Sequence, residues 1–226
     1  MSAPAPAGPL RLGVLLSGRG SNMLAIAENI RSGQLQGVEI AVAISNLADA
    51  PGLAAAGEYG LPTAVLVSKG RPRADHDADL IACLGEHKVD LVLLAGYMRL
   101  LSPGFLAAFP NRILNIHPSL LPAFPGLDTH ARALAAGVRF AGCTVHFVRA
   151  EMDHGPIVVQ AAVPVLPGDD AATLAARVLA AEHRAYPLAL RLMGEGRVKI
   201  VGERVAIAGA AGRIATLLNP SDESQA

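Results

Sequence analysis

The chain has no tryptophan, only two cysteines, few aromatic residues and no excess of charge of either sign. Cys83 and Cys143 lie far apart in the sequence, each among apolar residues, so neither a disulfide framework nor a zinc site is predicted and a reducing compartment is favoured. Lys plus Arg and Asp plus Glu both total 19. A nucleic-acid partner usually requires a basic surplus and is disfavoured, whereas small local anion sites are not.

Long apolar runs are also missing. No stretch of about 18 apolar residues occurs, so no membrane partner or span is predicted. The first residues, MSAPAPAGPL, lack the charged-then-apolar layout of a signal peptide, and we expect residues 1–10 to be a flexible tail. These features together predict a cytoplasmic protein.

What is present indicates an α/β protein. The 226 residues are 52% hydrophobic, which is enough for a substantial core. Apolar runs bounded by glycine alternate with helical patterns, which predicts one doubly wound, Rossmann-like domain over residues 11–208 and a C-terminal tail over 209–226. The sheet should be mostly parallel, with 90–96 central and the last two strands antiparallel. The expected strands are 11–17, 39–45, 63–67, 90–96, 112–117, 140–148 and 157–165.

The longest predicted helix covers about 170–194. Its apolar stripe advances by steps of four and three, with Glu182 at the edge of the stripe, where a carboxylate needs a partner. Pro187 is expected to kink the helix. The stripe consists of Leu174, Val178, Ala181, Ala185, Leu188 and Leu192. After it, VKIVGERVAI predicts a small hairpin.

A glycine-rich turn, SGRGSN at 17–22, follows the first predicted strand. Gly18 and Gly20 allow close approach of the backbone to a ligand, and Ser21 and Asn22 can cap the next helix and bind an anion. A dinucleotide site would need a third glycine at position 23 and an acid after the second strand, and both are absent. The pattern predicts a single-phosphate site, with a tight structural turn as the alternative.

The stretch LNIHPSLLPAFPG, residues 114–126, joins the end of an apolar run to a proline-rich loop. Asn115 and His117 are two residues apart, so on a strand their side chains point to the same face. An amide can stabilise an oxyanion while an imidazole handles a proton. A structural strand end with two hydrogen-bonded polar residues is the alternative. His146, in the middle of a predicted strand, is interpreted as a supporting rather than principal catalytic residue.

A second polar cluster lies in the first turn of the helix expected after the loop that contains Arg71 and Arg73. Asp75, His76, Asp77 and Asp79 could suggest a metal site, but acids in a first helical turn are favoured by the helix dipole. We therefore expect a solvated helix front and no metal.

Several motifs coincide in order: SGRGSN, LAGYMRLLS, LNIHPSLLPAFPG and HFVRAEMDHGP. Together, over about residues 11–200, the chain resembles the folate-dependent glycinamide ribonucleotide formyltransferases of purine biosynthesis. The resemblance implies that 10-formyltetrahydrofolate donates a formyl group to the amine of glycinamide ribonucleotide, in a monomer or homodimer with the formyltransferase fold. It also implies a cis Leu121–Pro122 bond. Asp128 and His154 depart from the family pattern, which puts local loop contacts in doubt.

The resemblance also implies three sets of site residues. The catalytic residues would be Asn115, His117 and Asp153. The ribonucleotide would contact Gly20, Ser21 and Asn22 through its phosphate and Glu182 through its sugar or amide part. The folate would contact Arg73, Met98, Arg99, Leu100, Leu101, Asn115, Val148, Arg149, Ala150, Glu151 and Met152.

The chemistry of the residues agrees with this resemblance. The chain has no G-x-S-x-G elbow, and neither cysteine lies in a recognisable motif with a histidine partner, which argues against a covalent acyl enzyme. Three alternative functions are disfavoured. A tRNA formyltransferase should carry a further basic domain, and a deformylase would not need a phosphate site. A regulatory nucleotide-binding module would not need Asn115, His117 and Asp153 to converge.

Overall fold

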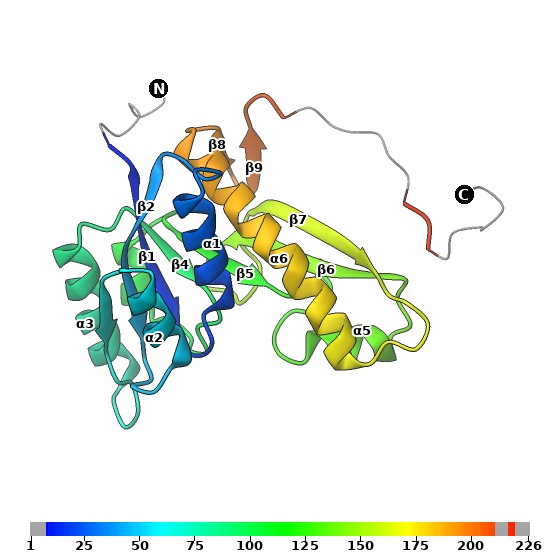
Figure 1. Ribbon diagram of the computed structural model, residues 1–226, viewed down its shortest axis with the longest axis horizontal. Helices are drawn as coiled ribbons and strands as arrows, with labels where there is room; N and C mark the ends of the chain where they lie inside the picture. The colour runs from blue at the N-terminus through cyan, green and yellow to red at the C-terminus, as the bar shows by residue number, and fades with distance from the viewer. Residues whose placement is uncertain (1–7, 211–216, 220–226) are drawn as a thin grey trace.

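The computed structural model describes residues 8–210 and 217–219, and its centre is a seven-stranded sheet (Figure 1). The strand order is β3-β2-β1-β4-β5-β6-β7. The first five strands are parallel, and β6 and β7 each run antiparallel to the preceding strand, as predicted. β4 is the middle strand, which confirms the expectation for residues 90–96. The strands are β1 (Leu10–Leu16), β2 (Val38–Ser45), β3 (Thr63–Val65), β4 (Leu91–Leu94), β5 (Ile113–His117), β6 (Phe140–Phe147) and β7 (Ile157–Pro164).

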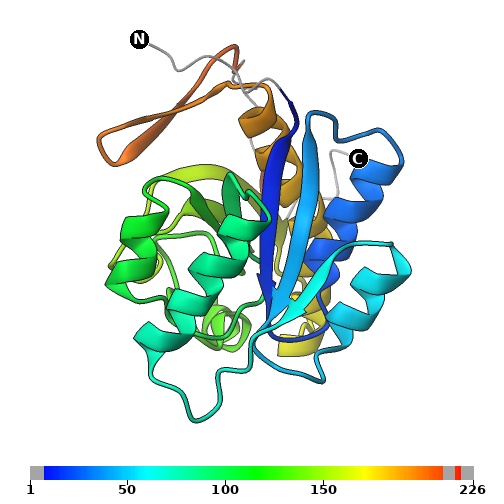
Figure 2. The same cartoon turned by 90° about the vertical axis from the view of Figure 1, so that its left-hand side faces the viewer.

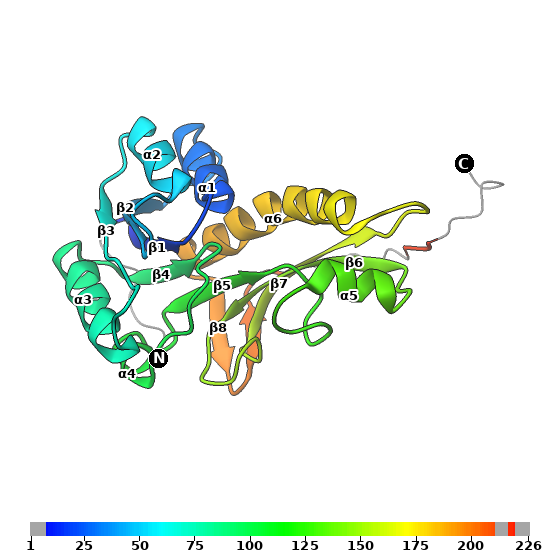
Figure 3. The same cartoon turned by 90° about the horizontal axis from the view of Figure 1, so that it is seen from below.

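Helices cover both faces of the sheet (Figure 3). On one face lie α1 (Ser21–Arg31), α2 (Pro51–Glu58) and the long α6 (Ala171–Gly194), and on the other α3 (Arg73–Glu86) and α4 (Pro103–Ala108). The short α5 (Thr129–Ala135) lies beside α6. Successive side chains of a strand point to opposite faces of the sheet, so each strand contributes to both cores. In β1, Leu12 and Val14 belong to the core under α1 and α6, whereas Leu15 belongs to the core under α3 and α4.

The helix α4 was not predicted, although its signals are present in the sequence. Ser102 is the N-cap residue, its side chain accepts a hydrogen bond from the Phe105 amide, and Pro103 occupies the first helical position. This is a favoured helix start. The helix is only six residues long, so it shows too little periodicity to be recognised from apolar spacing alone.

The two predicted tails differ in how much of them the structure describes. The N-terminal tail was drawn too long, because Leu10 already belongs to β1; residues 1–7 lie outside the described part. Within the predicted C-terminal tail, residues 211–216 and 220–226 also lie outside it. The Asn219 side chain donates hydrogen bonds to the carbonyls of Arg139 and Val165. The assignment of 11–208 to one domain stays a prediction.

The apolar stripe of α6 differs from the prediction at one position. Leu188 is exposed, and Ala189 is buried in its place, because the stripe advances by four residues from Ala185 rather than by three. The helix runs through the buried Pro187 without interruption, and a kink there stays a prediction. Glu182 is buried within the stripe.

After α6 the chain forms the predicted hairpin, β8 (Val198–Val201) paired with β9 (Arg204–Ile207), as a separate two-stranded sheet. Figure 2 shows the hairpin projecting from the main body. Among the helices of the described residues, none combines the length and apolar character that a membrane crossing requires.

Candidate active site

The glycine turn after β1 lies where the strand order reverses, between β1 and β4. In doubly wound sheets, ligands bind at this point. Ser17 Oγ accepts a hydrogen bond of 2.9 Å from the Met98 amide, so the turns after the two strands are joined.

Gly20 is the N-cap residue of α1, with φ of 68°, and no side chain caps the helix. The prediction that Ser21 and Asn22 provide the cap was therefore wrong. They are the first two residues of α1, so their backbone N–H groups have no acceptor within the helix. A Cβ on Gly20 would lie 3.1 Å from Gly52 Cα, so the backbone and its neighbour both favour glycine.

The Asn22 and Glu182 side chains, from α1 and α6, meet beside this turn. Asn22 Nδ2 donates a hydrogen bond of 2.7 Å to Glu182 Oε2. Burial raises the pKa of the Glu182 carboxyl, although the hydrogen bond from Asn22 opposes this shift. Asn22 Oδ1 is buried and has no partner among the described residues. The structure thus brings the predicted ribonucleotide residues together and leaves one buried acceptor free.

The Asn115, His117 and Asp153 side chains also converge. Asn115 pairs in register with Leu94, the last residue of β4. His117 Nε2 donates to the Phe124 carbonyl at 3.1 Å, so Nδ1 is the nitrogen that faces Asp153 Oδ2, at 3.5 Å.

Asp153 is held by its own loop. Its backbone has φ of 59°, and its Oδ2 accepts a hydrogen bond of 2.8 Å from the Gly126 amide. Aspartate tolerates this left-handed conformation better than most residues. The loop between β6 and β7 is thereby tied to the loop after β5, and the carboxylate is fixed beside the imidazole.

His146 completes the cluster from β6. Its Nδ1 donates to the Phe147 carbonyl at 3.0 Å, so its Nε2 can accept from Asn115 Nδ2 at 3.2 Å. Burial lowers the pKa of His146 and favours this neutral form. The same Nε2 lies 3.8 Å from Asp153 Oδ1. The interpretation of His146 as a supporting residue agrees with this geometry, since it orients the Asn115 amide.

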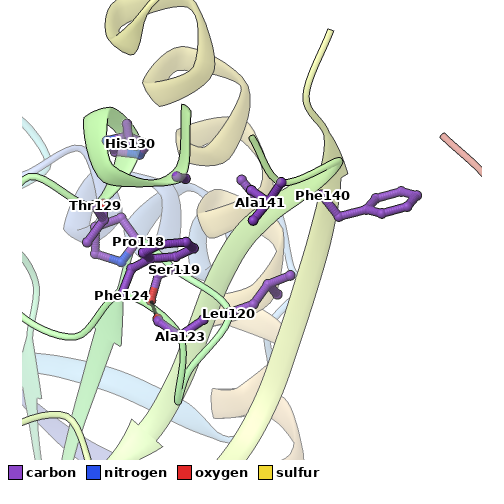
Figure 4. Close-up of a pocket in the computed structure, with 11 residues that line it drawn as sticks. Pro118, Ser119, Leu120, Ala123, Phe124, Thr129, His130, Phe140 and Ala141 are labelled. Atoms are coloured by element: carbon purple, nitrogen blue, oxygen red, sulfur yellow. Dashed lines mark hydrogen bonds between the residues drawn. The ribbon is translucent and has the colours of Figure 1, made fainter. Parts of the chain in front are cut away.

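The loop after β5 is fixed by buried hydrogen bonds and contains the expected cis Leu121–Pro122 bond. Thr144 Oγ1 donates to the Ser119 carbonyl at 2.7 Å and accepts from the Leu121 amide at 3.0 Å. Behind the loop lies a cavity of about 100 Å³, lined in part by His130 (Figure 4). Burial, with a smaller effect of His117, lowers the pKa of His130.

The predicted folate residues divide into two groups. Val148, Arg149 and Ala150 line a groove of about 540 Å³ with Leu106 and Ile113, two residues that the sequence did not suggest. The hairpin residues Ile200, Gly202 and Glu203 also line it.

The other predicted folate residues lie outside this groove. Met98, Leu100 and Met152 are exposed by 69%, 55% and 54%, which leaves large apolar side chains in solvent. Leu101 packs against the core under α3 and α4. Arg73 at the start of α3 and Glu151 in the β6–β7 loop are exposed.

Arg99 is directed away from the groove. Its guanidinium donates to the carbonyls of Ser68 and Arg71, at 3.2 and 3.3 Å. It therefore joins the loops after β3 and β4 rather than projecting freely toward a ligand.

The two departures from the family pattern lie outside the catalytic cluster. Asp128 is the exposed N-cap residue of α5 and makes no side-chain capping bond. His154 Nδ1 donates to the Met152 carbonyl at 2.8 Å.

The front of α3 contradicts the expectation of a solvated acidic turn. Asp75 and Asp79 are exposed, and Asp79 pairs with Arg71 at 2.7 Å, but His76 and Asp77 are buried. Within residues 8–210 and 217–219, no three His, Cys, Asp or Glu side chains are grouped so as to hold a metal ion.

Most of the chain is similar to proteins of known family. The formyl transferase family model matches residues 10–190. The phosphoribosylglycinamide formyltransferase of Escherichia coli is 44% identical over 188 residues, which cover 83% of this chain and 88% of that protein. The trifunctional purine biosynthetic protein adenosine-3 of Drosophila pseudoobscura pseudoobscura is 47% identical over 85% of this chain, but this chain spans only 14% of that protein's length.

A solved structure is also similar to this chain. The glycinamide ribonucleotide transformylase 1 of Symbiobacterium toebii is 53% identical and superposes with a TM-score of 0.86, over 89% of this chain and 95% of that one. The family match spans most of the chain, and the fold and sequence similarity agree with it. The chain belongs to the formyl transferase family.

Proposed function

We propose that this protein transfers the formyl group of 10-formyltetrahydrofolate to the amine of glycinamide ribonucleotide, a step of de novo purine biosynthesis. The names of the similar proteins from Escherichia coli and Symbiobacterium toebii support the reaction. The folate is a co-substrate, and the proposed chemistry uses no metal. We further propose that the protein works in the cytoplasm as a monomer or homodimer.

The ribonucleotide would bind at the N-terminus of α1. The free N–H groups of Ser21 and Asn22 and the positive end of the helix dipole suit a phosphate, and Gly20 lets it approach. Glu182 and the unpartnered Asn22 Oδ1 are acceptors for hydroxyl or amide donors of the substrate. A ligand donor there would satisfy an oxygen that is otherwise buried without a partner.

The folate would bind along the turns after β4 and β6. The exposed side chains of Met98, Leu100 and Met152 offer apolar surface for flat rings. The groove at Val148–Ala150 offers both polar and apolar side chains. Arg73, exposed at the start of α3, would meet the acidic end of the folate.

In the reaction, the substrate amine attacks the formyl carbon, a new C–N bond forms and the carbonyl oxygen becomes an oxyanion. Asn115 uses one amide hydrogen to hold His146, so its other hydrogen is free to donate to the oxyanion. His117, once protonated, adds a positive charge nearby. Preorganised donors of this kind stabilise charge that develops only along the reaction path.

The intermediate then collapses as the bond to the folate nitrogen breaks. The attacking nitrogen must lose a proton and the folate nitrogen must gain one. Asp153 and His117 Nδ1 face each other across 3.5 Å, so a proton on Nδ1 is held by the carboxylate, and the pair can accept and return it directly or through water.

The observation that carries the proposal is that the β6–β7 loop brings the Asp153 carboxylate beside His117, at the strand that bears Asn115. The test is product analysis after incubation with 10-formyltetrahydrofolate, with and without glycinamide ribonucleotide. We expect formylated ribonucleotide and tetrahydrofolate only when both substrates are present. Formate released at the same rate without the ribonucleotide would contradict the proposal and indicate a deformylase.

A further inference from the structure

The buried pair His76–Asp77 has no role in the chemistry described above, yet it lies under the turn assigned to the folate. The side chains are exposed by 0% and 1%, although both residues are in the first turns of α3, where polar side chains ordinarily reach solvent. Ionisable groups are seldom retained at such depth without a structural or functional use.

Asp77 holds the end of the turn that follows β4. Its Oδ2 accepts a hydrogen bond of 2.6 Å from the Ser102 amide. Ser102 is also the N-cap residue of α4, through its own side chain. The carboxylate therefore fixes the point at which the segment Tyr97–Ser102 ends and α4 begins.

The pair also connects this segment to the strand before α3. His76 Nε2 donates to the Leu66 carbonyl at 2.8 Å, and His76 Nδ1 lies 3.6 Å from Asp77 Oδ1. Leu66 directly follows β3. The two adjacent side chains thus reach from the end of β3 to the start of α4.

Four buried polar atoms around this pair have no hydrogen-bond partner among the described residues: His76 Nδ1, Asp77 Oδ1, Tyr97 Oη and Arg99 Nε. Asp77 and Arg99 both act on the phenol of Tyr97. Burial and, secondarily, Asp77 raise the pKa of Tyr97, while Arg99 opposes the shift. The buried side of Tyr97–Ser102 therefore combines polar atoms near the Asp77 carboxylate with Leu101, which packs against the core, while Met98 and Leu100 are exposed to solvent.

We propose that Asp77, supported by His76, is a positioning residue that sets the shape of Tyr97–Ser102 and thereby the affinity for the folate co-substrate. This inference rests on the proposed function. Asp77 touches neither substrate nor reacting atoms; it acts through the Ser102 amide. A charge-assisted hydrogen bond is about twice as strong as a neutral one, so its loss should loosen the segment without removing the acceptor.

The test is Asp77→Asn, which keeps the size and an acceptor oxygen but removes the charge. We expect the KM for 10-formyltetrahydrofolate to rise about tenfold, while kcat and the KM for the ribonucleotide stay within about twofold of wild type. Asp75→Asn is the matched control, since it makes the same change at an exposed position of the same helix, and it should leave all three constants unchanged.

An unchanged folate KM, or an equal rise of both KM values, in folded Asp77→Asn would overturn the inference. Should that variant yield no folded protein, His76→Gln takes its place, because its amide can still donate to Leu66 while Nδ1 is removed; the same split between the two KM values is expected. Wild-type protein that fails to make formylated ribonucleotide would refute the proposed function, whereas active wild type with an unaffected variant would refute only the role of Asp77.

Discussion

Replacing Asp153 by asparagine should separate the charge of this residue from its position. In the structure, Oδ2 accepts from the Gly126 amide at 2.8 Å and faces His117 Nδ1 at 3.5 Å, while Oδ1 lies 3.8 Å from His146 Nε2. An asparagine oxygen can still accept from Gly126, so the loop should keep its place. The amide nitrogen would then face His146 and could donate to the Nε2 that holds Asn115.

The magnitude follows from the distance. A protonated His117 and an ionised Asp153, 3.5 Å apart, attract each other by roughly 5 kcal/mol at an effective dielectric constant of about 20. Asparagine keeps part of this attraction through its oxygen dipole. We therefore expect kcat to fall about 10²–10³-fold, within the range that positioned acid–base groups contribute. The pH–rate profile should change shape, because an amide does not titrate in the accessible range.

The assay is steady-state formyl transfer between pH 6 and pH 9, with both KM values measured. Asp128→Asn is the control: Asp128 is exposed, makes no side-chain cap and already has a left-handed backbone that asparagine tolerates. A turnover for Asp153→Asn within about threefold of wild type would show that the charge of Asp153 is not needed. A strongly impaired variant with the wild-type pH profile would show that Asp153 has no part in proton transfer.

Two further changes test the ribonucleotide site. Gly20→Val should raise the KM for the ribonucleotide far more than that for the folate, because φ is 68° and the new Cβ would lie 3.1 Å from Gly52 Cα; equal rises in steady-state KM would argue against a phosphate site. Glu182→Gln should also raise the ribonucleotide KM, and it should stabilise the protein relative to wild type increasingly as pH rises. The pKa of Glu182 is raised in the folded protein above its ordinary 4.5, so above pH 4.5 the unfolded state releases the proton first and the wild type loses stability as pH rises through the folded value, whereas glutamine does not titrate. Urea unfolding of both proteins at pH 5 and pH 8 measures this difference, and a wild type that gains on the variant at pH 8 would contradict it.

The sequence predicted the sheet well because buried parallel strands leave a strong local signal. The most continuous apolar run correctly predicted β4 as the central strand of the sheet. The spacing of Asn115 and His117 predicted that both side chains lie on one face of β5. Asp153 could not be assigned to the same point from spacing. Its position depends on a loop that reaches the Gly126 amide, and only the resemblance to formyltransferases indicated it.

The errors arise where distant parts of the chain decide the outcome. Asp77 was expected in solvent because helix-dipole reasoning considers α3 alone, but the Ser102 amide packs onto it from a segment that follows β4. Asn22 was expected to cap α1, but its side chain donates a hydrogen bond to Glu182 on α6 instead. In each case the sequence suggests that a polar side chain serves its own helix, but its hydrogen-bond partner lies far along the chain.

The proposed mechanism depends most on Asn115, because the oxyanion needs a donor and the Asn115 amide is already oriented by His146. Its contribution should appear only along the reaction path, so substrate binding should not depend on it. Asn29→Ala, the same substitution in α1 with a side chain bonded to the Ala25 carbonyl, serves as the control.

The most direct measurement is therefore the steady-state kinetics of Asn115→Ala with both substrates varied. We expect kcat to fall about 10²–10³-fold while both KM values stay nearly unchanged. Near-normal turnover, or a loss that appears mainly as weaker binding of either substrate, would contradict this expectation.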